Sequence, residues 1–270
     1  MPSPRLIATD LDGTLLDPSG HVSPRTRAAL DAARAAGVPV VPVTARNPNG
    51  LRAIGAETGF DSWALCGNGA YGLDLATGRV LYTVEAAPEI LTPFATALSS
   101  RVPGVVFGAI RDAGEGFVAE PGYAALSSFD DHKRDPHTMH GSTRAEVVGA
   151  ASLKLVFRHA TVSTAELFAA ARGLGLSGFE MTLSGAPFVE LMAAGVTKAS
   201  GLDRLCAHLG INRSDVVAFG DGLNDVDMLA WAGTGYAVAN AGEAVRAAAD
   251  LVAPSNAEDG FAAIVEDLLA

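Results

Sequence analysis

The chain has 270 residues, 49% of them hydrophobic and 18% charged, and its 19 basic and 30 acidic residues give a net charge of −11. This composition is typical of a globular protein, and the length suffices for one large α/β domain or two smaller ones without a disulfide or a structural metal. The acidic balance argues against nucleic acid and anionic membranes as partners, and no apolar run approaches the roughly 18 residues of a membrane span.

The first 84 residues alternate apolar runs, which predict strands, with helix signals. Ser23 and Pro24 form a helix cap followed by proline at the first helical position, and Gly37 ends that helix. Apolar runs separated by helices predict a parallel sheet that is covered on both faces. In chain order we expect a strand at 6–9, a helix at 24–37, a strand at 38–43, a helix at 48–59, a strand at 63–66 and a hairpin over 71–84.

The pattern changes between residues 85 and 187 and then returns. The middle part mixes helices with strands around an irregular segment at 127–142. We therefore predict one α/β domain, residues 1–84 and 188–270, which is split by an inserted domain at residues 85–187. The expected elements are helices at 88–100 and 163–172, strands at 105–111, 117–120 and 153–158, and then a strand at 188–192, a helix at 197–209, a strand at 216–219, a helix at 225–231, short strands near 236–239 and 251–252, and a last helix from about 258.

Three apolar runs end in a polar residue, at Asp10, Thr44 and Asp221, and further carboxylates follow at Asp12 and Asp225. Open parallel sheets bind ligands beyond the carboxyl ends of their strands. If these strands are neighbours, the carboxylates converge there and repel one another unless a cation lies between them. Because oxygen ligands select a hard ion, the pattern predicts a Mg²⁺ site that also takes an anion.

Each of these residues also has an ordinary structural interpretation. An Asp-Gly pair such as Asp12-Gly13 is commonly a turn, and Asp227 is expected on a solvated helix surface. Lys198 is harder to explain in this way, because a cation at a helix start opposes the helix dipole and the chain otherwise uses arginine, with 16 Arg against 3 Lys. A ligand explains Lys198 better than surface charge does. The combination therefore favours a functional site.

Four motifs stand in order along the chain: Asp10-Leu11-Asp12-Gly13-Thr14-Leu15-Leu16, then Thr44, then Lys198, then Gly220-Asp221-Gly222-Leu223-Asn224-Asp225. Together they resemble the haloacid dehalogenase-like (HAD) superfamily. Three shorter segments, at 66–70, 240–241 and 255–260, further resemble its Cof-type phosphatases. The resemblance covers nearly all of residues 5–84 and 188–270, and the insertion matches a cap in position and length. It implies an α/β fold, a Rossmann-like parallel sheet core with an inserted α+β cap domain.

The resemblance also implies roles for individual residues. Asp10 would attack phosphorus and form an aspartyl-phosphate, and Asp12 would act as general acid and base. The metal ligands would be Asp10, the backbone carbonyl of Asp12, Asp221 and, in support, Asp225. The phosphate-binding residues would be Thr44, Ala45, Lys198 and Asn224. Ala45 and Ala199 depart from the family, in which glycine is usual at both positions, but neither change removes a hydrogen-bond donor.

We therefore expect a Mg²⁺-dependent phosphatase of small phosphorylated metabolites, with sugar phosphates as the default substrates. Flavin mononucleotide and pyridoxal phosphate remain open as substrates. A phosphomutase on the same scaffold is the alternative, and a non-catalytic binding protein is a third hypothesis. The two cysteines, Cys66 and Cys206, indicate reduced thiols and a cytoplasmic protein, which we expect as a monomer or homodimer.

Substrate specificity is expected to come from the inserted domain. Its polar segment carries His132, His137 and His140, whose spacing of five and three does not match one helical face, so a flexible loop is favoured over a second metal site. On its predicted strands, the cations could meet a second anionic group or lie at the surface; they are Arg111, Lys154 and Arg158. In the core domain, Pro42 cannot donate a ladder hydrogen bond, and a local break is expected there.

Overall fold

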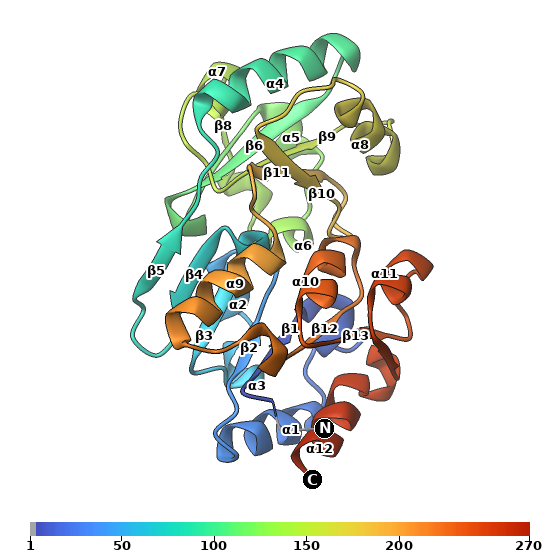
Figure 1. Ribbon diagram of the computed structural model, residues 1–270. Coiled ribbons are helices and arrows are strands. Elements are labelled where there is room, and N and C mark those ends of the chain that lie inside the picture. Colours follow the sequence, from blue (N-terminus) through green and yellow to red (C-terminus); the bar gives the residue numbers. More distant parts are fainter. Residues whose placement is uncertain (1–3) are drawn as a thin grey trace. The chain divides into compact units, whose positions relative to one another are not determined.

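The computed structural model describes residues 4–270, which fold into two compact units (Figure 1). The first unit comprises the described residues up to 45 together with residues 51–82 and 197–270. The second comprises residues 46–50 and 83–196. No helix within residues 4–270 combines the length and apolar character needed to cross a membrane.

A five-stranded parallel sheet forms the centre of the first unit. Its order is β14-β13-β12-β1-β2, so β1 lies between β12 and β2, as the predicted convergence of three strand ends requires. Thr9, the last residue of β1, lies opposite Phe219 on one side and Pro42 on the other. The strands are β1 (Leu6–Thr9), β2 (Val40–Pro42), β12 (Val216–Gly220), β13 (Thr234–Val238) and β14 (Leu251–Ala253).

Helices cover both faces of this sheet. Alternate strand residues such as Leu6 and Ala8 share a buried cluster with apolar residues of α9, α10 and α11, whereas Phe219 contacts Phe261 of α12 on the other face. The helix predicted over 48–59 is broken into α2 and α3 by a turn at residues 53–54. α2 (Pro48–Arg52) begins within residues 46–50 of the second unit. The helices of the first unit are α1 (Pro24–Ala35), α3 (Gly55–Thr58), α9 (Lys198–Leu209), α10 (Val226–Trp231), α11 (Glu243–Ala248) and α12 (Gly260–Leu269), and its single turns are η1 (Leu11–Leu15), η2 (Gly67–Gly69), η5 (Arg213–Asp215), η6 (Leu223–Asp225) and η7 (Asn256–Glu258).

The predicted break at Pro42 is confirmed. β2 ends there, and Val43 makes only an isolated parallel bridge to Leu65 of β3 (Trp63–Cys66). The backbone N–H of Val43 donates to the Thr9 carbonyl in β1, and the backbone N–H of Thr44 donates to the Leu65 carbonyl in β3. Because successive N–H groups point to opposite sides of a strand, the N–H that Pro42 lacks would have faced β3. The predicted hairpin is also present, as β4 (Tyr71–Asp74) and β5 (Val80–Thr83), which extend β3 into a three-stranded sheet.

The second unit contains a six-stranded sheet in the order β10-β11-β9-β6-β7-β8. All pairs are antiparallel except β7 with β8. The strands are β6 (Val106–Arg111), β7 (Gly116–Ala119), β8 (His140–Gly141), β9 (Lys154–Arg158), β10 (Phe179–Thr182) and β11 (Val189–Ala193). The helices are α4 (Pro88–Arg101), α5 (Pro121–Ala125), α6 (Phe129–His132), α7 (Arg144–Val148) and α8 (Thr164–Arg172), with single turns at η3 (Asp112–Gly114) and η4 (Pro136–Thr138).

The junction after the insertion lies later than we predicted. We placed the return to the core domain at residue 188, but β11 pairs with β9 and β10 in the six-stranded sheet, and the first unit resumes at Thr197. The apolar run of β11 is equally suited to a buried parallel strand and to an inner strand of an antiparallel sheet. Periodicity alone therefore could not assign this strand.

The polar segment of the second unit is more ordered than we expected. His132 ends α6, stacks on Phe188 at a centroid distance of 4.5 Å and lies 2.8 Å from the Tyr123 hydroxyl. Burial lowers the pKa of His132 to about 3. The flexible-loop interpretation is wrong for His132, because aromatic neighbours surround it. His137 lies in η4, and the side chain of His140 is outside the described residues.

The three cations suggested for a second anionic group have protein partners. Arg158 pairs with Asp131 at 2.6 Å, and Lys154 pairs with Glu190 at 2.6 Å in a buried pair. Arg111 donates to backbone carbonyls at the end of α7. These contacts give each cation a structural role within the second unit.

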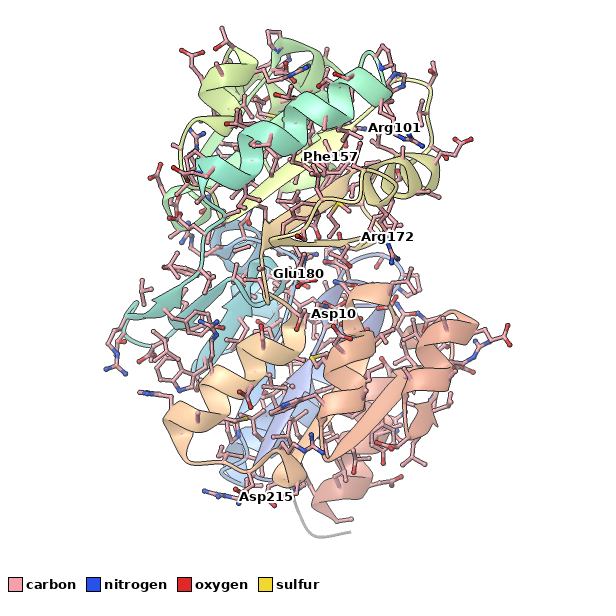
Figure 2. The ribbon with its side chains drawn as sticks, turned by 45° about the horizontal axis from the view of Figure 1, so that its top comes forward. Asp10, Arg101, Phe157, Arg172, Glu180 and Asp215 are labelled. Atoms are coloured by element: carbon pink, nitrogen blue, oxygen red, sulfur yellow. The ribbon has the colours of Figure 1, made fainter. Side chains whose placement is uncertain are left out.

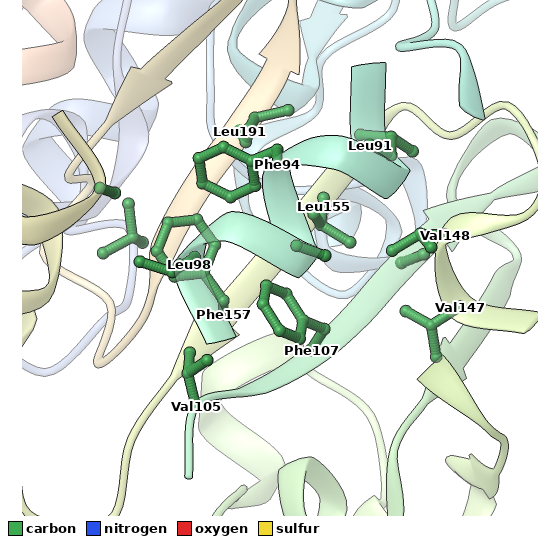
Figure 3. Packing of buried hydrophobic residues seen from close by; sticks show 14 of the residues in the cluster. Leu91, Phe94, Leu98, Val105, Phe107, Val147, Val148, Leu155, Phe157 and Leu191 are labelled. Carbon is green, nitrogen blue, oxygen red and sulfur yellow. The ribbon is translucent and has the colours of Figure 1, made fainter. Parts of the chain in front are cut away.

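Three phenylalanine rings form the centre of the second unit's core (Figure 3). Phe157 of β9 lies 5.4 Å from Phe94 of α4 and 5.9 Å from Phe107 of β6, measured between ring centroids. All three side chains are fully buried. These contacts join α4 to one face of the sheet.

We expect Phe157→Ala to lower the free energy of unfolding by about 3–5 kcal/mol, because it removes a buried ring and leaves a cavity. The matched control is Leu176→Ala at an exposed site of the same unit, which should change it by less than about 0.5 kcal/mol. Urea denaturation of the intact chain measures both. Equal effects of the two variants would contradict this account of the core.

Candidate active site

Three carboxylates converge at the carboxyl end of the parallel sheet. One oxygen from each of Asp10, Asp221 and Asp225 lies within 4.8 Å of the others. Asp10 follows β1, and Asp221 follows β12. Figure 2 shows Asp10 and Asp215, which precedes β12, toward opposite ends of the first unit. The predicted convergence of these three acids is confirmed as geometry.

A buried lysine lies between two of these acids. Lys198 is the first residue of α9, is 0% exposed, and its Nζ lies 2.7 Å from Asp10 Oδ1 and 2.6 Å from Asp225 Oδ1. Thr197 caps the helix by accepting a hydrogen bond from the Ser200 amide. The unfavourable position of a cation at a helix start is thus offset by two carboxylate partners. Lysine is used here for a charge interaction within the site.

Two glycines of the motifs allow this close approach. Gly13 has φ +84°, and a Cβ there would collide with the Asp221 carboxylate. A Cβ at Gly220 would collide with the side chain of Asp225. Any larger residue at either position would push one of the acids out of place. The Asp12-Gly13 pair therefore forms a turn that also shapes the site, whereas Gly220 ends β12 where the strand meets Asp225.

Hydrogen bonds fix the directions of the two acids that follow β12. Asp225 Oδ2 accepts the backbone N–H groups of Asp221 at 3.0 Å and Gly222 at 2.9 Å. Asp221 Oδ1 accepts the hydroxyl of Thr14 at 2.7 Å. Thr14 stands inside the first motif, but its role is visible only in the structure. The loop after β1 and the loop after β12 are joined directly through this bond.

Burial and mutual repulsion perturb the charges at the site. Burial raises the pKa of Asp10 above its ordinary value, with the Lys198 ammonium opposing and the Asp225 carboxylate adding to the rise. Burial also raises the pKa of Asp221, with the Thr14 hydrogen bond opposing it. For Lys198, burial alone would lower the pKa, but the two carboxylates outweigh burial and raise it. The negative charge of three ionised carboxylates would thus exceed the single positive charge of the Lys198 ammonium.

The other predicted residues occupy the same rim of the sheet. Thr44 is buried just beyond the end of β2, and Ala45 follows it. The backbone N–H of Thr44 donates to the Leu65 carbonyl. Asn224 lies in η6 between Asp221 and Asp225. The side chain of Asp12 is exposed in η1, and among residues 4–270 it is not part of the three-acid cluster. We predicted the backbone carbonyl of Asp12 as the metal ligand, which leaves its carboxyl for proton transfer.

Two asparagines, from the segments at 240–241 and 255–260, hold the loop that carries Asp12. Asn240 Nδ2 donates to the Gly13 carbonyl and Asn256 Nδ2 to the Leu16 carbonyl, both at 2.8 Å. The backbone N–H of Asn256 also donates to Asn240 Oδ1 at 3.0 Å. The loop is therefore tied to segments that come more than 220 residues later in the chain. Only the three-dimensional structure assigns these partners.

The donor set fits a hard divalent cation. Three carboxylates within 4.8 Å supply oxygen ligands, and a single ammonium does not neutralise them. Oxygen donors of this kind are those preferred by Mg²⁺, which keeps part of its shell for water and phosphate oxygens. The residues present therefore suit Mg²⁺.

We expect Lys198→Met to lower the free energy of unfolding by about 3–5 kcal/mol, because it leaves buried carboxylates without their cation. The matched control is Lys133→Met, which breaks the surface pair with Asp130 and should cost at most about 1 kcal/mol. Chemical denaturation without added divalent cations compares the two. A Lys198→Met variant as stable as Lys133→Met would show that the buried pair does not hold the site together.

Known proteins match the chain over nearly its whole length. Residues 7–265 match the family described as haloacid dehalogenase-like hydrolase. The pyridoxal phosphate phosphatase YbhA of Escherichia coli is 30% identical, with 97% of each chain covered, and the phosphatase YwpJ of Bacillus subtilis is 27% identical, with 98% of this chain and 100% of that one covered. The solved structure of the HAD subclass IIB sugar phosphatase BT4131 is 25% identical and superposes with a TM-score of 0.81, covering 97% of this chain and 98% of that one.

The site geometry and these similarities agree with each other. The family match at residues 7–265 includes both parts of the first unit, with the acids that follow β1 and β12, and the inserted second unit. The relatives carry phosphatase names and cover nearly the full chain. The chain belongs to the haloacid dehalogenase-like hydrolases and is an enzyme of their phosphatase group.

Proposed function

We propose that the protein is a Mg²⁺-dependent phosphatase that hydrolyses small phosphorylated metabolites, sugar phosphates first among them, through an aspartyl-phosphate. The observation that carries this proposal is the placement of Asp10. Its carboxylate is nearly buried, lies 2.7 Å from the ammonium of Lys198 and shares a cluster with two more acids. A carboxylate in such a place is suited to attack an anion that the surrounding cations neutralise.

In the first half of the reaction, an oxygen of Asp10 forms a bond to phosphorus while the bond from phosphorus to the substrate alcohol breaks. Both partners are negatively charged, so the ammonium of Lys198 lowers the barrier by neutralising the transferring phosphoryl group. The hydroxyl of Thr44 and the amide of Asn224 donate to phosphoryl oxygens. Asp12 gives its proton to the departing alcohol.

In the second half, water replaces Asp10 on phosphorus. The carboxylate of Asp12, now without its proton, takes one from the attacking water, and inorganic phosphate leaves with Asp10 restored. The exposed side chain of Asp12 can meet both the alcohol and the water, while Asn240 and Asn256 hold its loop. Two protonation states of one carboxyl thus serve both halves.

Asp10, Asp221, Asp225 and the backbone carbonyl of Asp12 would hold the Mg²⁺ ion. When bound, Mg²⁺ supplies positive charge to phosphate oxygens that the single ammonium cannot fully neutralise. Asp225 would act mainly in support, because its two oxygens already accept hydrogen bonds from Lys198 and from two backbone amides. Asp10 and Asp221 each engage one oxygen, with Lys198 and with Thr14, so each would offer its other oxygen to the ion.

The substrate class follows from the relatives and from the inserted unit. Two similar proteins are named for pyridoxal phosphate and for sugar substrates, and both substrates are small phosphate esters. The inserted unit, predicted at residues 85–187, is proposed to select among leaving groups, since the core residues address only the phosphate. We further propose a cytoplasmic enzyme, because a chain of 270 residues with two cysteines lacks the disulfide-rich composition of small proteins from oxidising compartments. A monomer or a homodimer is proposed as its assembly state.

Replacing Asp10 by Asn should abolish phosphate release, with a loss in kcat of at least about a thousandfold, because the nucleophile is removed. The matched control is Asp227→Asn, an exposed acid next to the same cluster, which should retain full activity. A screen of phosphorylated sugars, pyridoxal phosphate and flavin mononucleotide with Mg²⁺ gives the readout. Release of inorganic phosphate distinguishes hydrolysis from a phosphomutase, which would yield an isomerised sugar phosphate; turnover by Asp10→Asn would remove Asp10 from its role.

Mg²⁺ should raise the melting temperature, because it binds the folded site and not the unfolded chain. At a concentration of 100 times Kd the stabilisation is about 2.7 kcal/mol, which corresponds to a rise of several degrees. Asp221→Asn should lose most of this rise, and Asp227→Asn should keep it. Differential scanning fluorimetry with and without MgCl₂ measures the shifts, and an equal rise in both variants would place the ion elsewhere.

A further inference from the structure

Asn68 connects two parts of the phosphate-binding rim. It is 1% exposed, its backbone amide donates to the Thr44 carbonyl at 2.9 Å, and its Oδ1 accepts a hydrogen bond from Asn224 Nδ2 at 3.1 Å. Thr44 and Asn224 are the two neutral side chains that we assign to the phosphate. They come from positions 180 residues apart, and Asn68 is bonded to both.

The local sequence fixes Asn68 in this place. Gly67, Asn68 and Gly69 all have positive φ, at 59°, 57° and 90°, and asparagine is among the few non-glycine residues that adopt this conformation readily. A Cβ at Gly69 would collide with the Thr197 carbonyl, which precedes Lys198. The loop is therefore seated against the start of α9. The side chain of Asn68 is held by a backbone that has little freedom to move.

The bond matters because the amide of Asn224 has two chemically opposite ends. Its Nδ2 can donate to a phosphate oxygen, whereas its Oδ1 would repel one, and a rotation of the amide by 180° exchanges them. In the structure Oδ1 is directed toward Gly222, where a Cβ would collide with it. One N–H of Nδ2 is given to Asn68. In this orientation Nδ2 has a second N–H that can be donated to a phosphoryl oxygen.

We propose that Asn68 is a positioning residue for phosphoryl recognition: by accepting one hydrogen bond from Asn224, it fixes the amide orientation that offers the other N–H to a phosphoryl oxygen. The inference deepens the proposed function and rests on it. It gives a physical role to the Cys66–Ala70 segment, whose sequence alone indicates a family resemblance and no mechanism. Asn68 acts through Asn224, without contacting the substrate itself.

A double-mutant cycle tests this dependence. Asn68→Gly keeps the positive φ and the backbone bond to Thr44 and removes only the carboxamide. We expect it to reduce kcat/KM for p-nitrophenyl phosphate with Mg²⁺ by about tenfold, as does Asn224→Ala, because in both variants the charged phosphoryl group loses the hydrogen bond from the Asn224 amide. The double variant should lie within about twofold of Asn224→Ala alone, because Asn68 has then nothing left to orient.

Phosphate affinity provides a second readout that does not depend on turnover. The Kd of inorganic phosphate, measured by calorimetry with Mg²⁺, should rise by a factor similar to the loss in kcat/KM in each variant. Asn212→Gly, at an exposed asparagine of the same unit, is the matched control and should leave both quantities unchanged. Losses that multiply in the double variant, or single variants within twofold of the wild type, would overturn the proposal.

Should Asn68→Gly fail to fold, the wild-type protein gives a further test, with Asn224→Ala needed for the assignment of signals. The side-chain amide signals of Asn224, assigned by their absence in Asn224→Ala, should shift in a ¹⁵N correlation spectrum when phosphate is added with Mg²⁺. Unshifted signals at saturating phosphate would overturn the proposal. A wild type that binds phosphate but hydrolyses no ester would refute the proposed function and leave the Asn68 test decisive; a wild type that binds no phosphate would refute both.

Discussion

The ammonium of Lys198 is the interaction on which the first unit's active site depends. It is fully buried and contacts Asp10 from the end of β1 and Asp225 from the start of α10, so one charge joins three distant segments of the chain. A buried pair is stable only when every partner is present, because an unpaired charge in the interior costs several kcal/mol. The site therefore forms only when β1, α9 and β12 have all assembled. Its geometry is a consequence of the sheet.

The neighbouring loops break local rules in order to permit this arrangement. A lysine stands at a helix start, three successive residues at 67–69 adopt positive φ, and acids are held together against their repulsion. The lysine position, the positive φ of Asn68 and the clustered acids are each unfavourable taken alone, whereas Gly67 and Gly69 adopt positive φ readily. Proteins tolerate such conflicts where function requires them, and compensate with contacts elsewhere. Here the compensation comes from Thr14, Asn240 and Asn256, which tie the loop after β1 to the rest of the unit.

Much of the fold and of the cluster could be predicted, because strand ends carry their polar residues to a common edge. The acids at Asp10 and Asp221 follow apolar runs, and repulsion between carboxylates points to a cation whatever the details of packing. The partner of an amide cannot be found in this way, since asparagine is common in turns and only coordinates show that Asn68 meets Asn224. The strand partners of β11 are likewise not visible in the sequence, which predicts this strand in the core domain although it pairs with β9 and β10. An apolar run records burial and does not record which strands lie beside it.

The use of lysine in this chain reflects the shape of its buried sites. Of the three lysines, Lys198 and Lys154 are buried in ion pairs, and Lys133 lies in a surface pair. The guanidinium group of arginine has five N–H donors in a rigid plane, and a closed pocket with one or two carboxylates would leave some of these donors without acceptors. The compact ammonium of lysine needs fewer acceptors and can turn toward each. Arginines such as Arg111 and Arg144 lie where carbonyls or rings contact the wider group, so two of the three lysines, Lys154 and Lys198, occupy places where charge is enclosed.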